Sequence, residues 1–172
     1  MCGPVFSRAS AMTSKHLVGI CGIYCGACMV YRAYKDNDQD LIQSLTKMGF
    51  SKGEVRCEGC TSDIIAPKCG TCIFKECVKS RGISYCFECP DLGCEKLIDL
   101  SEKRARIENK PHLRLCPQNL EKLKEVGTEE WLARQDRRWS CESCGKRLHW
   151  YSNACPSCGT EFYNAIREAH AL

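Results

Sequence analysis

The sequence has no long hydrophobic run. No stretch of its 172 residues approaches the roughly 20 apolar residues that a membrane-spanning helix needs. Residues 1–19 contain no continuous apolar run long enough for the core of an export signal. We therefore expect a cytoplasmic protein. In that reducing compartment cysteine pairs usually bind metal rather than form disulfides.

Familiar catalytic motifs are also missing. The sequence has no phosphate-binding loop, no H-E-x-x-H pair and no recognisable Ser/His/Asp arrangement. A cysteine nucleophile would need a thiol outside any metal site and a neighbouring base that lowers its pKa, and no pattern singles one out. We name no catalytic residue and no residue for an organic cofactor. Whether the protein is an enzyme stays open, with a non-catalytic role favoured.

Apolar residues are scarcer than the composition suggests. The apolar share of 44% includes 17 cysteines, and without them it falls to roughly a third, which is thin for a self-sufficient core. Cysteines at nearly a tenth of the residues indicate a scaffold held by metal ions or by disulfides, of which the reducing compartment favours metal. Four loaded thiolate sites would bring the formal charge of +4 to about −4. Net charge therefore gives no support to a nucleic-acid partner.

The most specific motif lies near the C-terminus. Two C-x2-C pairs, separated by ten residues, contain Cys141, Cys144, Cys155 and Cys158. Each pair forms a tight turn whose sulfurs converge, so the four predict one tetrahedral site for zinc or for a single iron. The segment "LHWYS" between the pairs has strand composition, and we expect a hairpin there. We also expect this tail to fold around its own site.

Eleven further cysteines lie between residues 21 and 94 in four groups, which include two copies of C-x2-C-x4-C. The predicted ligands are Cys21, Cys25, Cys28, Cys57, Cys60, Cys69, Cys72, Cys77, Cys86, Cys89 and Cys94. Cys116, Cys2 and His112 remain open as further ligands, and the sequence does not reveal which groups share an ion. Interleaved and sequential ligation fit equally well.

The first group, "CGIYCGAC", has the C-x3-C-x2-C spacing of a radical enzyme's iron–sulfur cluster. Such enzymes build a large partial α/β barrel behind that motif. Here about 150 residues remain, and they hold further cysteine pairs rather than alternating strands and helices. We therefore interpret the group as part of a multi-cysteine metal scaffold.

A family resemblance rests on motifs in a fixed order. "GICGIYCGAC", "CEGC", C-x2-C-x4-C and "GISYCFECPDLGCEKL" resemble a family of small cysteine-rich proteins from bacteria and archaea, catalogued as a domain of unknown function. Residues 119–145 resemble the helix–Trp–zinc-ribbon ending of its longer members, so the likeness covers roughly 17–163. The resemblance implies a metal-binding cytoplasmic protein and supplies no reaction.

The predicted fold is a small metal-stabilised α+β protein. Periodic apolar residues and caps predict a helix after Asp38 or Asp40 that ends at Gly49, and a helical stretch after Pro117 that Gly127 interrupts. The expected organisation is a disordered leader (1–14), a cysteine-knuckle domain with short helices (17–110), a helical connector (111–138), a zinc-ribbon hairpin (139–163) and a tail (164–172).

The functional expectation is a zinc protein with about three to four ions per chain, acting as a non-catalytic interaction or regulatory module. The alternative is a redox protein with [4Fe–4S] clusters or rubredoxin-type iron, alone or with zinc. We expect an unidentified protein partner and no membrane. A nucleic-acid partner stays open without support from the net charge.

Overall fold

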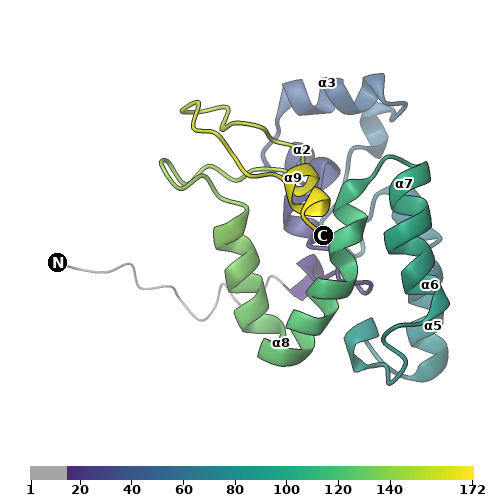
Figure 1. The fold of residues 1–172 in the computed structure, drawn as a ribbon. Coiled ribbons are helices and arrows are strands. Elements are labelled where there is room, and N and C mark those ends of the chain that lie inside the picture. The colour runs from purple at the N-terminus through teal and green to yellow at the C-terminus, as the bar shows by residue number, and fades with distance from the viewer. Residues whose placement is uncertain (1–14) are drawn as a thin grey trace.

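The computed structural model describes residues 15–172, and these residues form a helical molecule (Figure 1). The disordered leader predicted for 1–14 lies outside the described residues. The α-helices are α2 (Met29–Lys35), α3 (Gln39–Lys47), α4 (Pro67–Gly70), α5 (Ile73–Arg81), α6 (Glu95–Ile98), α7 (Ala105–Ile107), α8 (Cys116–Arg138) and α9 (Ala165–His170). A π-helical segment, Asp99–Arg104, joins α6 to α7. The 3-10 turns are Lys15–Leu17, Cys25–Ala27, Lys52–Glu54, Cys86–Glu88 and Pro111–Leu115.

The predicted α+β fold class is wrong. The described residues contain no β-strand and no sheet, only three isolated antiparallel bridges that pair Val18 with Tyr24, Ser140 with Arg147 and Ala154 with Glu161. The last two bridges close the two tail cysteine turns at equivalent positions.

The zinc-ribbon hairpin predicted between the tail turns is also absent, because the backbone there is bonded elsewhere. The Trp150 amide donates to the Ala27 carbonyl at 3.0 Å, and the Trp150 carbonyl accepts from the Ala165 amide at 2.9 Å. The Ser152 amide turns back to the His149 carbonyl at 3.1 Å. A segment committed to these partners cannot also form a strand ladder.

Local sequence signals are confirmed in several helices. Asp38 caps α3, where its side chain accepts from the Leu41 amide at 3.0 Å. Gly49 follows α3 with φ +93°, a conformation that favours glycine. Gly127 breaks α8 with φ +77° and ψ +168°, so that the helix forms two arms that meet at an angle (Figure 1).

The main core joins the front, middle and end of the chain. Leu120, Leu123 and Trp131 of α8 are buried with the segment that contains Val18, and Trp150 and Ala165 of the tail belong to the same apolar cluster. A smaller cluster around Leu45 lies under α2 and α3. The domain boundaries proposed from sequence stay a prediction, while the core shows that these segments pack together.

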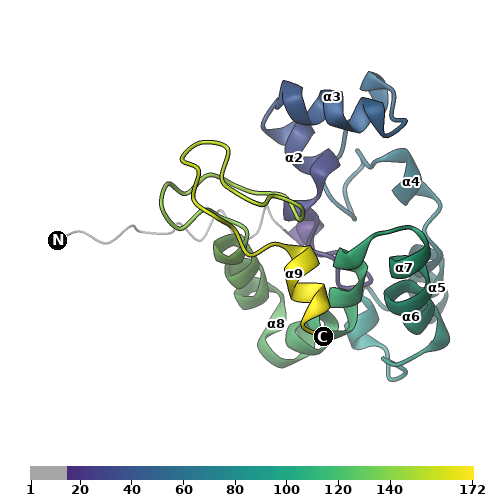
Figure 2. The same cartoon turned by 45° about the horizontal axis from the view of Figure 1, so that its top comes forward.

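The C-terminal helix α9 lies against the 3-10 turn Pro111–Leu115 that precedes α8, between the tail loops and α7 (Figure 2). The Asn164 side chain caps it by accepting from the Ile166 and Arg167 amides at 3.1 and 3.2 Å. Arg114, in the turn before α8, donates to the Ala169 carbonyl at 2.6 Å. None of the described helices combines the length and the apolar character needed to cross a bilayer.

Candidate metal centres

The four tail cysteines converge on one point. The sulfurs of Cys141, Cys144, Cys155 and Cys158 all lie within 4.8 Å of one another. Cys141 Sγ is 3.5 Å from Cys158 Sγ, and Cys144 Sγ is 3.5 Å from Cys155 Sγ. A tetrahedron of sulfurs around zinc, with zinc–sulfur bonds of about 2.3 Å, has edges of about 3.8 Å. The observed spacing therefore suits one tetrahedral ion.

Glycine makes both tail turns possible. Gly145 and Gly159 follow the second cysteine of each pair, with φ of +74° and +75°. Each glycine amide donates to the carbonyl of the first cysteine, Cys141 at 2.8 Å and Cys155 at 2.9 Å. A side chain at these positions would strain the left-handed conformation. The repeated turn places both sulfurs of each pair toward the common centre.

The protein environment favours a thiolate at Cys158. Thr160 Oγ1 lies 3.3 Å from Cys158 Sγ. Hydrogen bonds from the Thr160 hydroxyl and backbone amide lower the pKa of Cys158 to about 6, and Cys141 adds to the shift. Metal binding requires deprotonated thiols, so this shift prepares Cys158 as a ligand near neutral pH.

A second group of cysteines lies around the start of α2. The Cys25 thiol hydrogen-bonds to Cys60, which lowers the pKa of Cys60 to about 6 and raises that of Cys25. Burial raises the pKa of Cys28 to about 12, and negative charge at Cys57 and Cys69 adds to this shift. These thiols come from three of the sequence groups, so the structure interleaves them.

A third group lies beside α5. Cys77, Cys86, Cys89 and Cys94 line one small cavity. Burial raises the pKa of Cys86 to about 12, and the other three cysteines add to the shift after Cys21. The two C-x2-C-x4-C motifs form two triads, of which the first is Cys69, Cys72 and Cys77 and the second is Cys86, Cys89 and Cys94. Cys77 thus lies with the second triad and apart from the other two cysteines of its own.

The structure shows what surrounds Cys116 and His112, two residues whose ligand roles the sequence left open. Cys116 is fully buried beside Cys21, and its hydrogen bond, together with burial, raises the pKa of the Cys21 thiol. His112 is buried and stacks on Trp150 with 3.8 Å between ring centroids, while its Nδ1 contacts the Tyr151 hydroxyl. His112 thus packs the turn before α8 against two aromatic residues of the tail, Trp150 and Tyr151. Cys2 lies outside the described residues.

Within residues 15–172, only the tail brings all of its ligand atoms inside 4.8 Å of one another. The ligand roles predicted for the front cysteines therefore stay predictions, although the structure gathers the thiols into groups. Sequence reasoning missed two residues that contact sulfur, Thr160 and Arg81. Arg81 Nη1 donates to Cys89 Sγ at 3.4 Å. The sequence signal for Arg81 was its position four residues after Cys77, because residues at this spacing lie on the same face of a helix.

The front part of the chain matches a family of proteins. Residues 17–99 match the family model described as "Protein of unknown function (DUF3795)". The matched range contains all eleven front cysteines and ends before α8, so the resemblance proposed for residues 119–145 stays a prediction. Comparison with the curated proteins and with the solved structures found no match.

Proposed function

We propose that the protein is a non-catalytic zinc module, in which thiolate-bound ions hold the chain in shape. The observation that carries this proposal is the convergence of the four tail sulfurs within 4.8 Å. The tail has turns and isolated bridges in place of strands, so few backbone bonds hold it together. Structural zinc contributes about 10–16 kcal/mol in zinc-finger peptides, as much as the whole stability of many domains.

The donor set favours zinc in a structural role. Four protein sulfurs complete a tetrahedral site and leave no open position for water or substrate, as structural zinc sites do. A single iron accepts the same four thiolates, and it would make the protein a redox module. Zinc leaves the purified protein colourless, whereas iron–thiolate centres absorb visible light.

The exposed surface near the tail supports a protein partner over a nucleic acid. Arg134 pairs with Glu130 at 2.8 Å, Arg138 pairs with Glu168 at 3.0 Å, and Arg147 pairs with Asp136. These ion pairs compensate three of the four arginines between residues 134 and 147, and the fourth, Arg137, shares Glu130 at 4.0 Å. A nucleic acid is held largely by uncompensated Lys and Arg on its phosphates. We therefore propose that the module acts by binding another protein.

The test of the zinc module is a metal count on protein purified without oxygen. Cys158→Ser should lose about one zinc ion per chain, because an S4 site with one ligand removed binds far more weakly. Cys158 is exposed, so the substitution opens no core cavity. The matched control is Ser157→Ala in the same turn, which keeps every sulfur and should keep every ion. Unchanged metal in Cys158→Ser would contradict the proposal.

A further inference from the structure

The cavity beside α5 brings together four cysteines from two different sequence triads. Cys77 is on α5, Cys86 and Cys89 belong to the 3-10 turn Cys86–Glu88 and its C-terminal cap, and Cys94 directly precedes α6. All four side chains line the same cavity of about 20 Å³. That volume holds little more than one water-sized object.

From this juxtaposition we propose a second metal site, in which one tetrahedral ion is held by Cys77, Cys86, Cys89 and Cys94. The proposal rests on the proposed function as a thiolate–metal protein and assigns one of its ligand sets. The small volume suits a single ion better than a cluster of four irons and four sulfides. No three of these sulfurs lie within 4.8 Å of one another in the structure, so binding requires the side chains to rotate into the cavity that they line, toward edges of about 3.8 Å.

The local backbone suits this role. The Cys89 amide donates to the Cys86 carbonyl at 3.1 Å, which closes the C-x2-C turn. Cys94 has φ −64° and ψ +155°, an extended conformation at the start of α6. Its carbonyl accepts from the Leu97 amide at 2.9 Å, so the helix fixes the direction of the chain at this cysteine. The fourth sulfur comes from the neighbouring helix α5.

Arg81 supplies positive charge beside the negatively charged site. Four thiolates around a divalent ion leave a site charge of −2. The Arg81 guanidinium donates to Cys89 Sγ at 3.4 Å and lines the same cavity. A donor to a ligand sulfur offsets the charge and orients the ligand, as neighbouring hydrogen bonds do around other metal ions.

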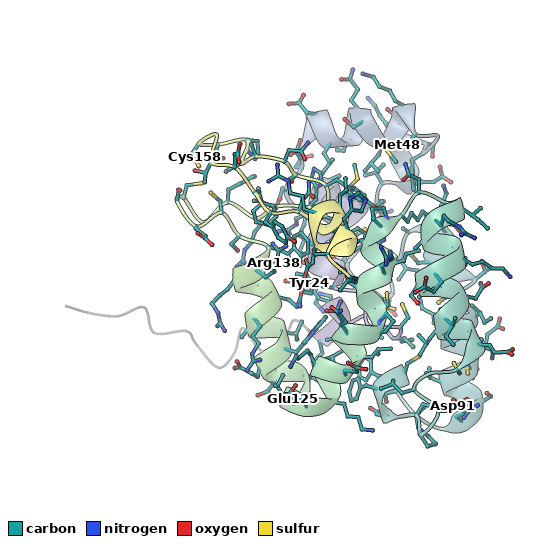
Figure 3. The ribbon with its side chains drawn as sticks, viewed as in Figure 1. Tyr24, Met48, Asp91, Glu125, Arg138 and Cys158 are labelled. Atoms are coloured by element: carbon teal, nitrogen blue, oxygen red, sulfur yellow. The ribbon has the colours of Figure 1, made fainter. Side chains whose placement is uncertain are left out.

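Cys69 and Cys72, the remaining cysteines of the first triad, do not belong to this site. Burial raises the pKa of Cys69 to about 11, and Cys57, Cys60 and Cys72 add to the shift, whereas the cavity lining includes neither Cys69 nor Cys72. The site is also remote from the tail: Asp91, which lines the cavity, and Cys158 lie at opposite sides of the molecule in Figure 3. The two ions should therefore bind independently.

Metal counts in paired variants test the ligand set. Cys77→Ser and Cys89→Ser should each lose about one ion, and the double variant should still lose about one, because both remove the same site. Cys89→Ser combined with Cys158→Ser should lose about two. A loss of two ions in Cys77→Ser/Cys89→Ser, or full metal in Cys77→Ser, would overturn the ligand set. Unchanged metal in Cys158→Ser alone would instead contradict the proposed function.

Stepwise chelation of the wild-type protein gives a readout that needs no variant. Each removed ion exposes its thiols to iodoacetamide, and mass spectrometry identifies the labelled cysteines. Cys77, Cys86, Cys89 and Cys94 should become labelled together in one step, separately from the four tail cysteines. Labelling of Cys77 together with Cys69 and Cys72, in a step that leaves Cys86 and Cys89 protected, would overturn the proposal.

Discussion

The buried His112 should make the protein lose stability on mild acidification. Burial lowers the pKa of His112 to about 3, and the positive charge of Lys110 adds to the shift. The unfolded chain has an ordinary histidine pKa of about 6.5, so between pH 6.5 and 3 it binds a proton that the folded protein excludes. Stability therefore falls with pH below 6.5. Between pH 7.5 and 5.5 the loss from this group is about 1 kcal/mol.

The assay is urea unfolding of wild-type protein and of His112→Phe at pH 7.5 and 5.5. The phenylalanine ring can keep the stack on Trp150 but cannot take a proton. The wild type should lose about 1 kcal/mol more than the variant across this interval. Protonation of the metal-binding thiols affects both proteins alike and cancels in the difference.

The matched control is Tyr151→Phe. This variant removes the hydroxyl that contacts His112 Nδ1 and leaves the imidazole in place, so it should keep the pH dependence of the wild type. The same pH dependence in His112→Phe and in the wild type would refute the reasoning, because it would mean that His112 takes up its proton in the folded protein.

Three further substitutions probe other parts of the structure. Gly22→Ala should cost at least about 2 kcal/mol in urea unfolding, because φ is +90° and the new methyl would meet the backbone of α8 at 2.6 Å; Gly53→Ala, in open space, should be nearly neutral. Asp38→Ala should cost about 1 kcal/mol by removing the cap of α3, and an unchanged unfolding midpoint would contradict that role. Thr160→Val should raise the pKa of Cys158, so a pH titration of bound metal should show the tail ion released at a higher pH; an unshifted release would mean that the hydroxyl is not a donor to the sulfur.

Short-range signals predicted much of the helical structure. Asp38 and Gly49 marked the limits of α3, Gly127 marked the break in α8, and Pro117 lies in the first turn of that helix. In these cases one residue decides the local backbone through a cap, a positive φ or a missing amide hydrogen. The spacing of the tail cysteines likewise predicted the convergence of their sulfurs, because the C-x2-C turn is itself local.

Other features depend on contacts between residues that are distant in the sequence, and these could not be predicted from local patterns. The strand composition of "LHWYS" was overridden by backbone bonds from Trp150 to Ala27 and Ala165, which no local pattern reveals. Ile98 and Ile107 are 54% and 73% exposed, and the π-helical segment between them interrupts the regular helical period. Cys77 joins the second triad only because α5 packs beside it.

The tail is tied to the rest of the protein more closely than an independent module would be. The ring of Trp150 stacks on His112, its backbone bonds reach Ala27 and Ala165, and Trp139 belongs to the main core. We expect loss of the tail ion to disturb these anchors as well as the cysteine turns. Near-ultraviolet circular dichroism of Cys158→Ser would show this as a changed tryptophan signal, and an unchanged signal would mean that the anchors of Trp139 and Trp150 hold without the tail ion.

Metal analysis by mass spectrometry, together with the visible spectrum of protein purified without oxygen, tests the central claim most directly. Thiolate-bound zinc predicts a colourless protein with at least about two zinc ions per chain, one in the tail and one beside α5. Iron with visible absorption would contradict the zinc assignment and indicate a redox protein. A chain without bound metal would contradict the whole account of how its cysteines are used.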